Sequence, residues 1–261
     1  MINHRINVLR NQYNKVPNLI LSFPRCGRTW MKHLFGHYIA RQWNVDFSKW
    51  VDRPRPGMPG IPKILFRHDY MSMTGHIPWE EYFKLQDNKE FFFVPEMKLQ
   101  NIVYLFRDPL DVLFSYWPYL QSIPYKNFTC PQHTDIIDFA KNKQWGLDVI
   151  INFMNKQLDH FEQHQGRKLL VRYEDLKKQD SEWEKLISFT FKAFELDSFT
   201  YAKEQTTFEK MQQKNNADAP SELKFYRKGG SNYIFDLPKD QQDILLNWPG
   251  YNDLNNRINE N

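Results

Sequence analysis

Length, composition and charge narrow the class of protein before any motif is considered. The chain has 261 residues, 41% hydrophobic and 16% aromatic, so it can bury a large core without disulfides. Its net charge of +4, from 35 basic and 31 acidic residues, argues against non-specific nucleic-acid binding and is compatible with a local basic pocket.

The lack of a recognisable targeting segment and the small number of cysteines predict a soluble, cytoplasmic protein. Residues 1–18 lack the apolar core of a signal peptide, and no apolar run is long enough to span a bilayer. The two cysteines, Cys26 and Cys130, are far apart in the sequence and do not have the spacing of metal ligands. We therefore expect a reducing compartment and two inert thiols.

The first predicted strand leads into a turn suited to anions. Residues 19–23 are apolar, and residues 29–42 carry large apolar side chains at helical spacing. Gly27 lets backbone N–H groups converge, and Thr29 is placed to cap the helix. Three basic residues add positive charge at the positive end of this helix: Arg25, Arg28 and Lys32. The stretch predicts an anion site, although an ordinary strand-to-helix turn can have the same pattern.

Three further strands and several helices are expected along the chain. Apolar runs predict strands at residues 63–67, 101–106 and 168–172. Asp108 and Pro109 have the residue types of a helix cap and first helical position. A long loop is expected at residues 43–62, a long amphipathic helix at 134–163 ended by Gly166, and further helices at 181–194, 199–213 and 238–248.

Short strands alternating with helices predict an α/β fold. We expect a single domain over residues 1–261, with its core at about 17–250: a mostly parallel sheet flanked by helices, with a phosphate-loop-like turn after the first strand. Ligands of such sheets bind beyond the carboxyl ends of the strands. Four residues follow the four predicted strand ends and should converge there: Arg25, His68, Arg107 and Tyr173.

Five segments make the chain resemble the sulfotransferases that use 3′-phosphoadenosine-5′-phosphosulfate (PAPS). They appear in the family's order, and the resemblance covers about residues 17–250. Residues 22–30 are similar to the family's 5′-phosphosulfate loop, and residues 103–116 to its 3′-phosphate segment. Residues 173–176 are similar to the Y-E-D segment, 206–211 to the T-S-F-x-x-M segment near adenine, and 227–229 to the R-K-G segment. The resemblance implies a P-loop-like phosphosulfate-binding loop, PAPS as donor and adenosine 3′,5′-bisphosphate (PAP) as product.

The resemblance also implies the binding residues. The 5′-phosphosulfate loop comprises Arg25, Cys26, Gly27, Arg28, Thr29 and Trp30; the 3′-phosphate residues are Arg107, Ser115, Arg227, Lys228 and Gly229; and Tyr173, Thr207 and Phe208 lie near adenine. The chain departs from the family's pattern at Arg25, where the family has lysine, and at Cys26, where it has serine. The usual G-x-W-K continuation after Gly229 is also missing. Because arginine keeps its proton, an electrostatic role is expected for Arg25.

His68 is the candidate catalytic base. Imidazole titrates near neutral pH and can take a proton from an acceptor, and the position directly after the second predicted strand resembles that of the family's catalytic histidine. An ordinary surface histidine is the alternative for His68. Core packing is likewise the alternative for Trp30, Tyr173 and Phe208.

We therefore expect transfer of a sulfuryl group from PAPS to a hydroxyl or amine of a small-molecule acceptor. No metal, nucleic acid or membrane partner is expected. The sequence does not indicate an oligomeric state. Aromatic residues suggest a ring-lined acceptor pocket: Trp79, Tyr82, Trp117 and Tyr119. Two alternatives stay open, namely a kinase-like nucleotide-binding protein and a family member that has lost turnover.

Overall fold

A parallel four-stranded sheet forms the centre of the computed structural model, which describes residues 18–46, 61–62, 64–67, 101–122, 135–143, 145–218 and 233–261. The strands are β1 (Asn18–Ser22), β2 (Ile64–Arg67), β3 (Asn101–Phe106) and β4 (Lys168–Arg172), in the order β2-β1-β3-β4. All three strand pairs are parallel. The predicted fold class is therefore confirmed, with strand ends shifted by at most one residue from the expected ranges.

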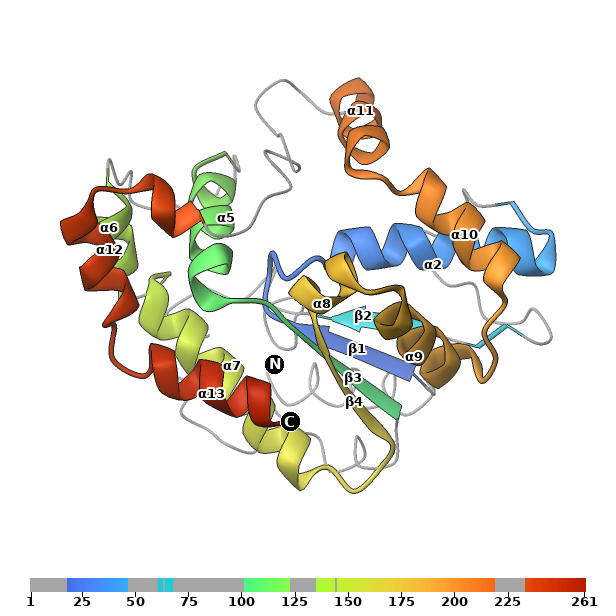
Figure 1. Cartoon of the computed structure of the whole chain (residues 1–261), viewed down its shortest axis with the longest axis horizontal. Coiled ribbons are helices and arrows are strands. Elements are labelled where there is room, and N and C mark those ends of the chain that lie inside the picture. The colour runs from blue at the N-terminus through green and yellow to red at the C-terminus, as the bar shows by residue number, and fades with distance from the viewer. Residues whose placement is uncertain are drawn as a thin grey trace, which may run out of the picture.

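Helices cover the sheet on two sides (Figure 1). Figure 1 shows α5, α7 and α13 on one side and α2, α9 and α10 on the other. The helical elements are α2 (Arg28–Trp43), α5 (Pro109–Ser122), α6 (Ile136–Ala140), α7 (Leu147–Gln163), α8 (Tyr173–Lys178), α9 (Asp180–Phe191), α10 (Leu196–Gln205), α11 (Phe208–Asp218), the 3₁₀ helix η3 (Tyr233–Asp236), α12 (Lys239–Leu246) and α13 (Tyr251–Glu260). Within the described part of the chain, no helix combines the length and apolar character needed to cross a membrane.

Burial on both faces explains why the central strands could be recognised in the sequence. Leu19 and Ile20 of β1 are completely buried, and residues 102–106 of β3 are at most 1% exposed. A strand covered on both faces has a continuous apolar run in place of alternation. The two central strands, β1 and β3, have this character.

The predicted helix over residues 134–163 is wrong, because the chain forms two helices there, α6 and α7. Trp145 is buried in the connection, and its N–H donates to Asn142 Oδ1 at 3.1 Å. The backbone passes so close at Gly146 that a Cβ there would lie 2.2 Å from the carbonyl oxygen of Ala140. A tight connection, which periodicity does not reveal, therefore interrupts the amphipathic pattern.

Two helix ends also differ from the prediction. α7 ends at Gln163 and not near Gly166, because His164 adopts an extended backbone while its N–H donates to His160 O. The expected helix over 199–213 is divided into α10 and α11. The break falls at Thr206, whose hydroxyl donates to Ala202 O at 2.8 Å. α13 was not predicted.

A buried histidine links β3 to α7. The Tyr104 hydroxyl hydrogen-bonds to His160 Nδ1, which can accept because burial, together with the nearby His164 and Lys168, lowers the pKa of His160 to about 3. An unfolded chain would protonate this imidazole near pH 6.5. Below that pH the unfolded state binds more protons, so this group makes the fold less stable as the pH falls from about 6.5 towards 3.

We expect His160→Gln to flatten the acid side of the stability curve. The wild-type free energy of unfolding should fall more steeply between pH 6 and pH 4, by up to about 1.4 kcal/mol per pH unit. Urea unfolding at several pH values measures this slope. Tyr104→Phe is the control, since it removes the hydrogen bond but leaves the imidazole buried, so it should keep the wild-type slope. Equal slopes in wild type and His160→Gln would contradict the assignment.

Candidate anion-binding site

The turn between β1 and α2 has the backbone of an anion-binding loop. Arg25 and Gly27 have left-handed backbones, with φ values of 73° and 92°. Gly27 is the N-cap of α2, and no side chain caps this end of the helix. The predicted Thr29 cap is therefore wrong: Thr29 lies exposed in the first turn, one residue inside the helix. The positive end of the helix dipole faces the loop, as anion binding requires.

The side chain of Cys26 is not available to a ligand. It is completely buried, and burial raises the pKa of its thiol to about 12. Cys26 can therefore contribute only backbone groups to an anion site, and its thiol stays protonated. The charge of the loop comes from the half-buried side chains of Arg25 and Arg28.

Arg107 connects the loop to the end of β3. Its side chain is buried, and Nη1 donates to the carbonyl oxygen of Arg25 at 3.0 Å. Nη2 lies 4.0 Å from Asp111 Oδ2, and the guanidinium carbon lies 4.7 Å from the centre of the Tyr173 ring. One cation thus contacts the β1–α2 loop, α5 and α8.

Arg25 and Ser115 lie in direct contact. Nε of Arg25 donates to Ser115 Oγ at 3.0 Å, and the Arg25 guanidinium carbon lies 5.0 Å from the centre of the Tyr119 ring. With Arg107, the structure thereby brings together three predicted anion-binding residues from two segments, 22–30 and 103–116. Tyr119 was expected only as part of an acceptor pocket. Its spacing of four residues from Ser115 on α5 was the signal that the two share a helix face.

A cluster of aromatic residues lies next to the loop. Trp30 and Tyr173 meet edge to face at 5.7 Å, and Trp30 meets Trp183 at 5.0 Å. The indole N–H of Trp30 donates to Thr206 O at 3.1 Å, which brings the start of the 206–211 segment to the same place. In that segment Thr207 is exposed and Phe208 half-buried. The residues predicted near adenine come from two separate segments, and Trp30 contacts both segments, at Tyr173 and at Thr206.

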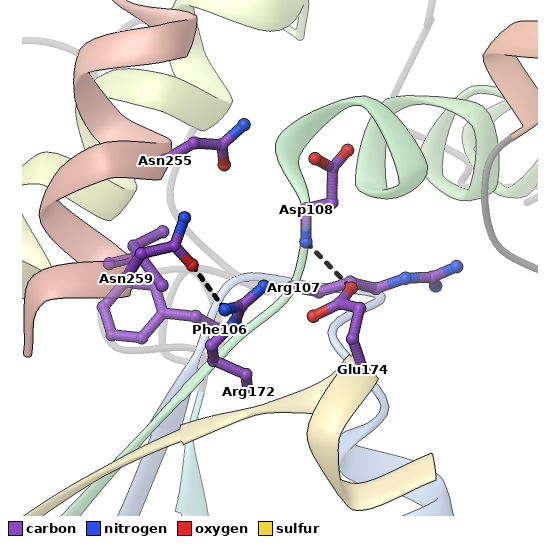
Figure 2. A pocket seen from close by; sticks show the side chains of 8 residues that line it. Phe106, Arg107, Asp108, Arg172, Glu174, Asn255 and Asn259 are labelled. Carbon is purple, nitrogen blue, oxygen red and sulfur yellow. Dashed lines mark hydrogen bonds between the residues drawn. The ribbon is translucent and has the colours of Figure 1, made fainter. Parts of the chain in front are cut away.

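Asp108 organises the start of α5, as predicted. Its Oδ1 accepts from Leu110 N at 2.9 Å and Asp111 N at 3.0 Å. The N–H of Asp108 donates to Glu174 Oε1 at 3.1 Å (Figure 2). The hydroxyl of Tyr251 donates to the other carboxylate oxygen, Oδ2, at 2.8 Å. Sequence reasoning assigned no role to Glu174 or Tyr251, and Tyr251 lies too far along the chain for any local pattern to pair it with Asp108.

Several predicted site residues lie outside the described residues, namely His68, Trp79, Tyr82, Arg227, Lys228 and Gly229. Cys130, predicted to be an inert thiol, also lies outside them. The position of β2 is described: Arg67, its last residue, pairs with Leu21 of β1.

Trp117, which was predicted to line an acceptor pocket, is half-buried in α5, where its ring stacks on Phe139 at 6.3 Å.

Gly27 is required both by its backbone and by its neighbour. A Cβ at this position would lie 2.4 Å from Tyr173 Cδ2. Gly250, with φ 76°, offers a matched control, since a Cβ there would meet only Ile151 Cγ2 at 3.5 Å. We expect Gly250→Ala to cost about 1–2 kcal/mol of unfolding free energy for its left-handed backbone, and Gly27→Ala to cost more, because Tyr173 must also move. Urea unfolding measures both, and equal losses would contradict the close packing at Gly27.

Comparisons with known proteins give the family and the fold. The sulfotransferase domain family matches residues 17–245. A search of curated proteins finds no match. Mouse sulfotransferase SULT7A1 complexed with PAP has a similar structure, with a TM-score of 0.56 and 16% identity over 94% of this chain and 89% of that one. Retinol dehydratase in complex with androsterone and inactive cofactor PAP is also similar, with a TM-score of 0.55 and 15% identity over 93% of this chain and 79% of that one. The two structures show a shared fold, and the family match establishes that the chain belongs to the sulfotransferase domain family.

Proposed function

We propose that this protein transfers a sulfuryl group from PAPS to a hydroxyl or amine of a small-molecule acceptor and releases PAP. The observation that carries the proposal is the contact network of Arg107, Arg25 and Ser115, in which both hydrogen bonds measure 3.0 Å. Family membership and the similarity to two proteins whose crystal structures contain PAP support the donor.

The two phosphate ends of the donor fit different parts of the network. The amides at the start of α2, with Arg25 and Arg28, suit the 5′-phosphosulfate, since an uncapped helix start and two cations attract negative charge. Arg107 and Ser115 suit the 3′-phosphate, and we assign Arg227, Lys228 and Gly229 to the same group from the resemblance of their segment. Four residues are proposed to contact adenine: Trp30, Tyr173, Thr207 and Phe208.

The proposed chemistry is an in-line displacement at sulfur. The acceptor oxygen or nitrogen forms a bond to sulfur while the bond from sulfur to the 5′-phosphate oxygen breaks, and that oxygen keeps the electron pair. Negative charge grows on the leaving phosphate, where Arg25 and the helix amides stabilise it. Arg25 acts through its charge, because a guanidinium does not release a proton at working pH.

We propose His68 as the base that removes the acceptor's proton. β2 ends at Arg67, which pairs with Leu21 one residue before the end of β1. His68 therefore follows a strand that ends at the same edge of the sheet as the Arg25 loop. A neutral imidazole there would accept the proton as the acceptor attacks.

Family membership weakens one of the two alternative functions. A kinase-like protein would have no need of a 3′-phosphate site, and the family match argues against it. The alternative of a catalytically impaired member predicts donor binding without turnover. An assay of sulfuryl transfer from labelled PAPS across a set of acceptors decides between this alternative and the proposal.

Binding of the 3′-phosphate tests the proposed donor directly. The wild type should bind PAP more tightly than adenosine 5′-monophosphate, and Arg107→Ala should weaken PAP about ten- to a hundredfold while leaving the monophosphate nearly unchanged. This factor corresponds to about 1.5–3 kcal/mol for a hydrogen bond to a charged group. Titration calorimetry with both ligands measures it.

Two further variants make this test specific. Arg107 also holds the Arg25 carbonyl, so a loss for both ligands could reflect a disturbed loop. Ser115→Ala leaves that bond in place and should still weaken PAP selectively. Arg41→Ala, at an exposed ion pair with Asp197, should change neither affinity. Equal binding of the two ligands by the wild type would overturn the donor assignment.

His68→Ala should lower kcat about a hundredfold or more and leave PAP affinity near the wild-type value, because a base acts in the transition state and not on the bound product. Steady-state rates with calorimetry on the same preparations measure both effects. His37→Ala, in α2 against Tyr201, is the histidine control. A normal rate, or a loss of PAP affinity as large as the loss of rate, would remove His68 from the mechanism.

A further inference from the structure

The C-terminal helix α13 lies beyond the part of the chain that matches the family. The match ends at residue 245, whereas α13 spans Tyr251–Glu260. Its buried residues, Tyr251, Leu254 and Ile258, repeat at intervals of three and four and so form one face of the helix. This face packs on the domain, and α13 contacts α7.

One end of α13 reaches the residue that follows Arg107. Tyr251 is 8% exposed, and its hydroxyl donates to Asp108 Oδ2 at 2.8 Å. Oδ1 of the same carboxylate caps α5. With both oxygens held, the carboxylate cannot rotate away from either partner. Burial and the adjacent Asp108 raise the pKa of Tyr251, which keeps the hydroxyl protonated and able to donate.

The other end of α13 reaches the strand that precedes Tyr173. Nη1 of Arg172, the last residue of β4, donates to Asn259 Oδ1 (Figure 2). Figure 2 shows Asn255 and Asn259 on α13, on the side that faces Asp108 after β3 and Arg172 at the end of β4. These side chains line a pocket of about 140 Å³ between α13 and the carboxyl ends of β3 and β4.

Arg257 anchors α13 to α7. The guanidinium of Arg257 donates from Nη1 to Asn155 at 2.8 Å and from Nη2 to Asp159 at 2.8 Å and Glu162 at 2.9 Å, all three on α7. α7 in turn packs against β3 and α5. α13 is therefore fixed to α7, and the hydrogen bond from Tyr251 to Asp108 comes from a helix that is itself held in place.

We propose that α13 is a working part of the donor site, in which Tyr251 is a positioning residue that orients the Arg107 segment for the 3′-phosphate. This inference rests on the proposed function. Asp108 lies between Arg107 and α5, the helix that carries Ser115. Holding the Asp108 carboxylate therefore holds the backbone on both sides of the proposed 3′-phosphate site, without any contact between Tyr251 and the ligand.

The test uses Tyr251→Phe in the full chain, which removes one hydroxyl and keeps the buried ring. By calorimetry, affinity for PAP should fall about three- to tenfold, the value of one ordinary hydrogen bond, while affinity for adenosine 5′-monophosphate stays constant. The KM for PAPS should rise with little change in kcat. Tyr201→Phe, at an exposed tyrosine on α10, is the matched control and should change neither. A purely structural role would lower the melting temperature and leave the PAP-to-monophosphate ratio unchanged, which would overturn the proposal.

A double-mutant cycle tests whether Tyr251 acts through Arg107. In an Arg107→Ala background, Tyr251→Phe should weaken PAP binding less than it does in the wild type, because only the contribution of Ser115 remains to be disturbed. Fully additive losses would overturn the positioning role.

Amide hydrogen exchange separates this inference from the proposed function. Tyr251→Phe should speed exchange at Leu110 and Asp111, the N–H groups that Asp108 caps, without any ligand. If the wild type fails to prefer PAP but exchange accelerates, the proposed function fails and the positioning role stands. If the wild type prefers PAP and the variant changes neither exchange nor the preference, the positioning role is wrong.

Discussion

The contacts of the buried Arg107 guanidinium are the interactions on which the rest of the site depends. A buried cation is costly unless its hydrogen bonds and charge are met, and here a loop carbonyl, the Asp111 carboxylate and the face of the Tyr173 ring surround it. Each partner belongs to a different segment. The cation therefore fixes the relative positions of the β1–α2 loop, α5 and α8.

The order of the strands explains why these segments meet. β1 lies between β2 and β3, so the chain leaves β1 towards one side, returns through β2 and crosses to the other side at β3. Ligands of open parallel sheets bind where the strand order reverses, which here is at the ends of β1 and β3. Arg25 and Arg107 follow these two strands. The register places Phe106 opposite Arg172, which brings Tyr173 to the same edge.

The sequence predicted those parts of the structure that depend on local patterns. β1 and β3 are continuous apolar runs because both of their faces are covered, and Asp108 and Pro109 have the residue types of a helix start. The convergence of Arg25 and Arg107 followed from the parallel sheet. The errors arose where tertiary packing determines the local structure. Gly27, and not Thr29, is the N-cap of α2, and a tight connection at Gly146 divides the predicted long helix into α6 and α7. Tyr251 and Asp108 are 143 residues apart, a distance that no local pattern spans.

The burial of Cys26 has a consequence for how the protein meets oxidants and alkylating reagents. Thiol reactions proceed through the thiolate, and burial raises the pKa of Cys26 so far that its thiol stays protonated at neutral pH. A cysteine in the middle of an anion-binding loop would ordinarily expose the loop to redox inactivation. Here the side chain points into the core, so Cys26 becomes reactive only when the fold around the loop opens, and its modification would report that opening.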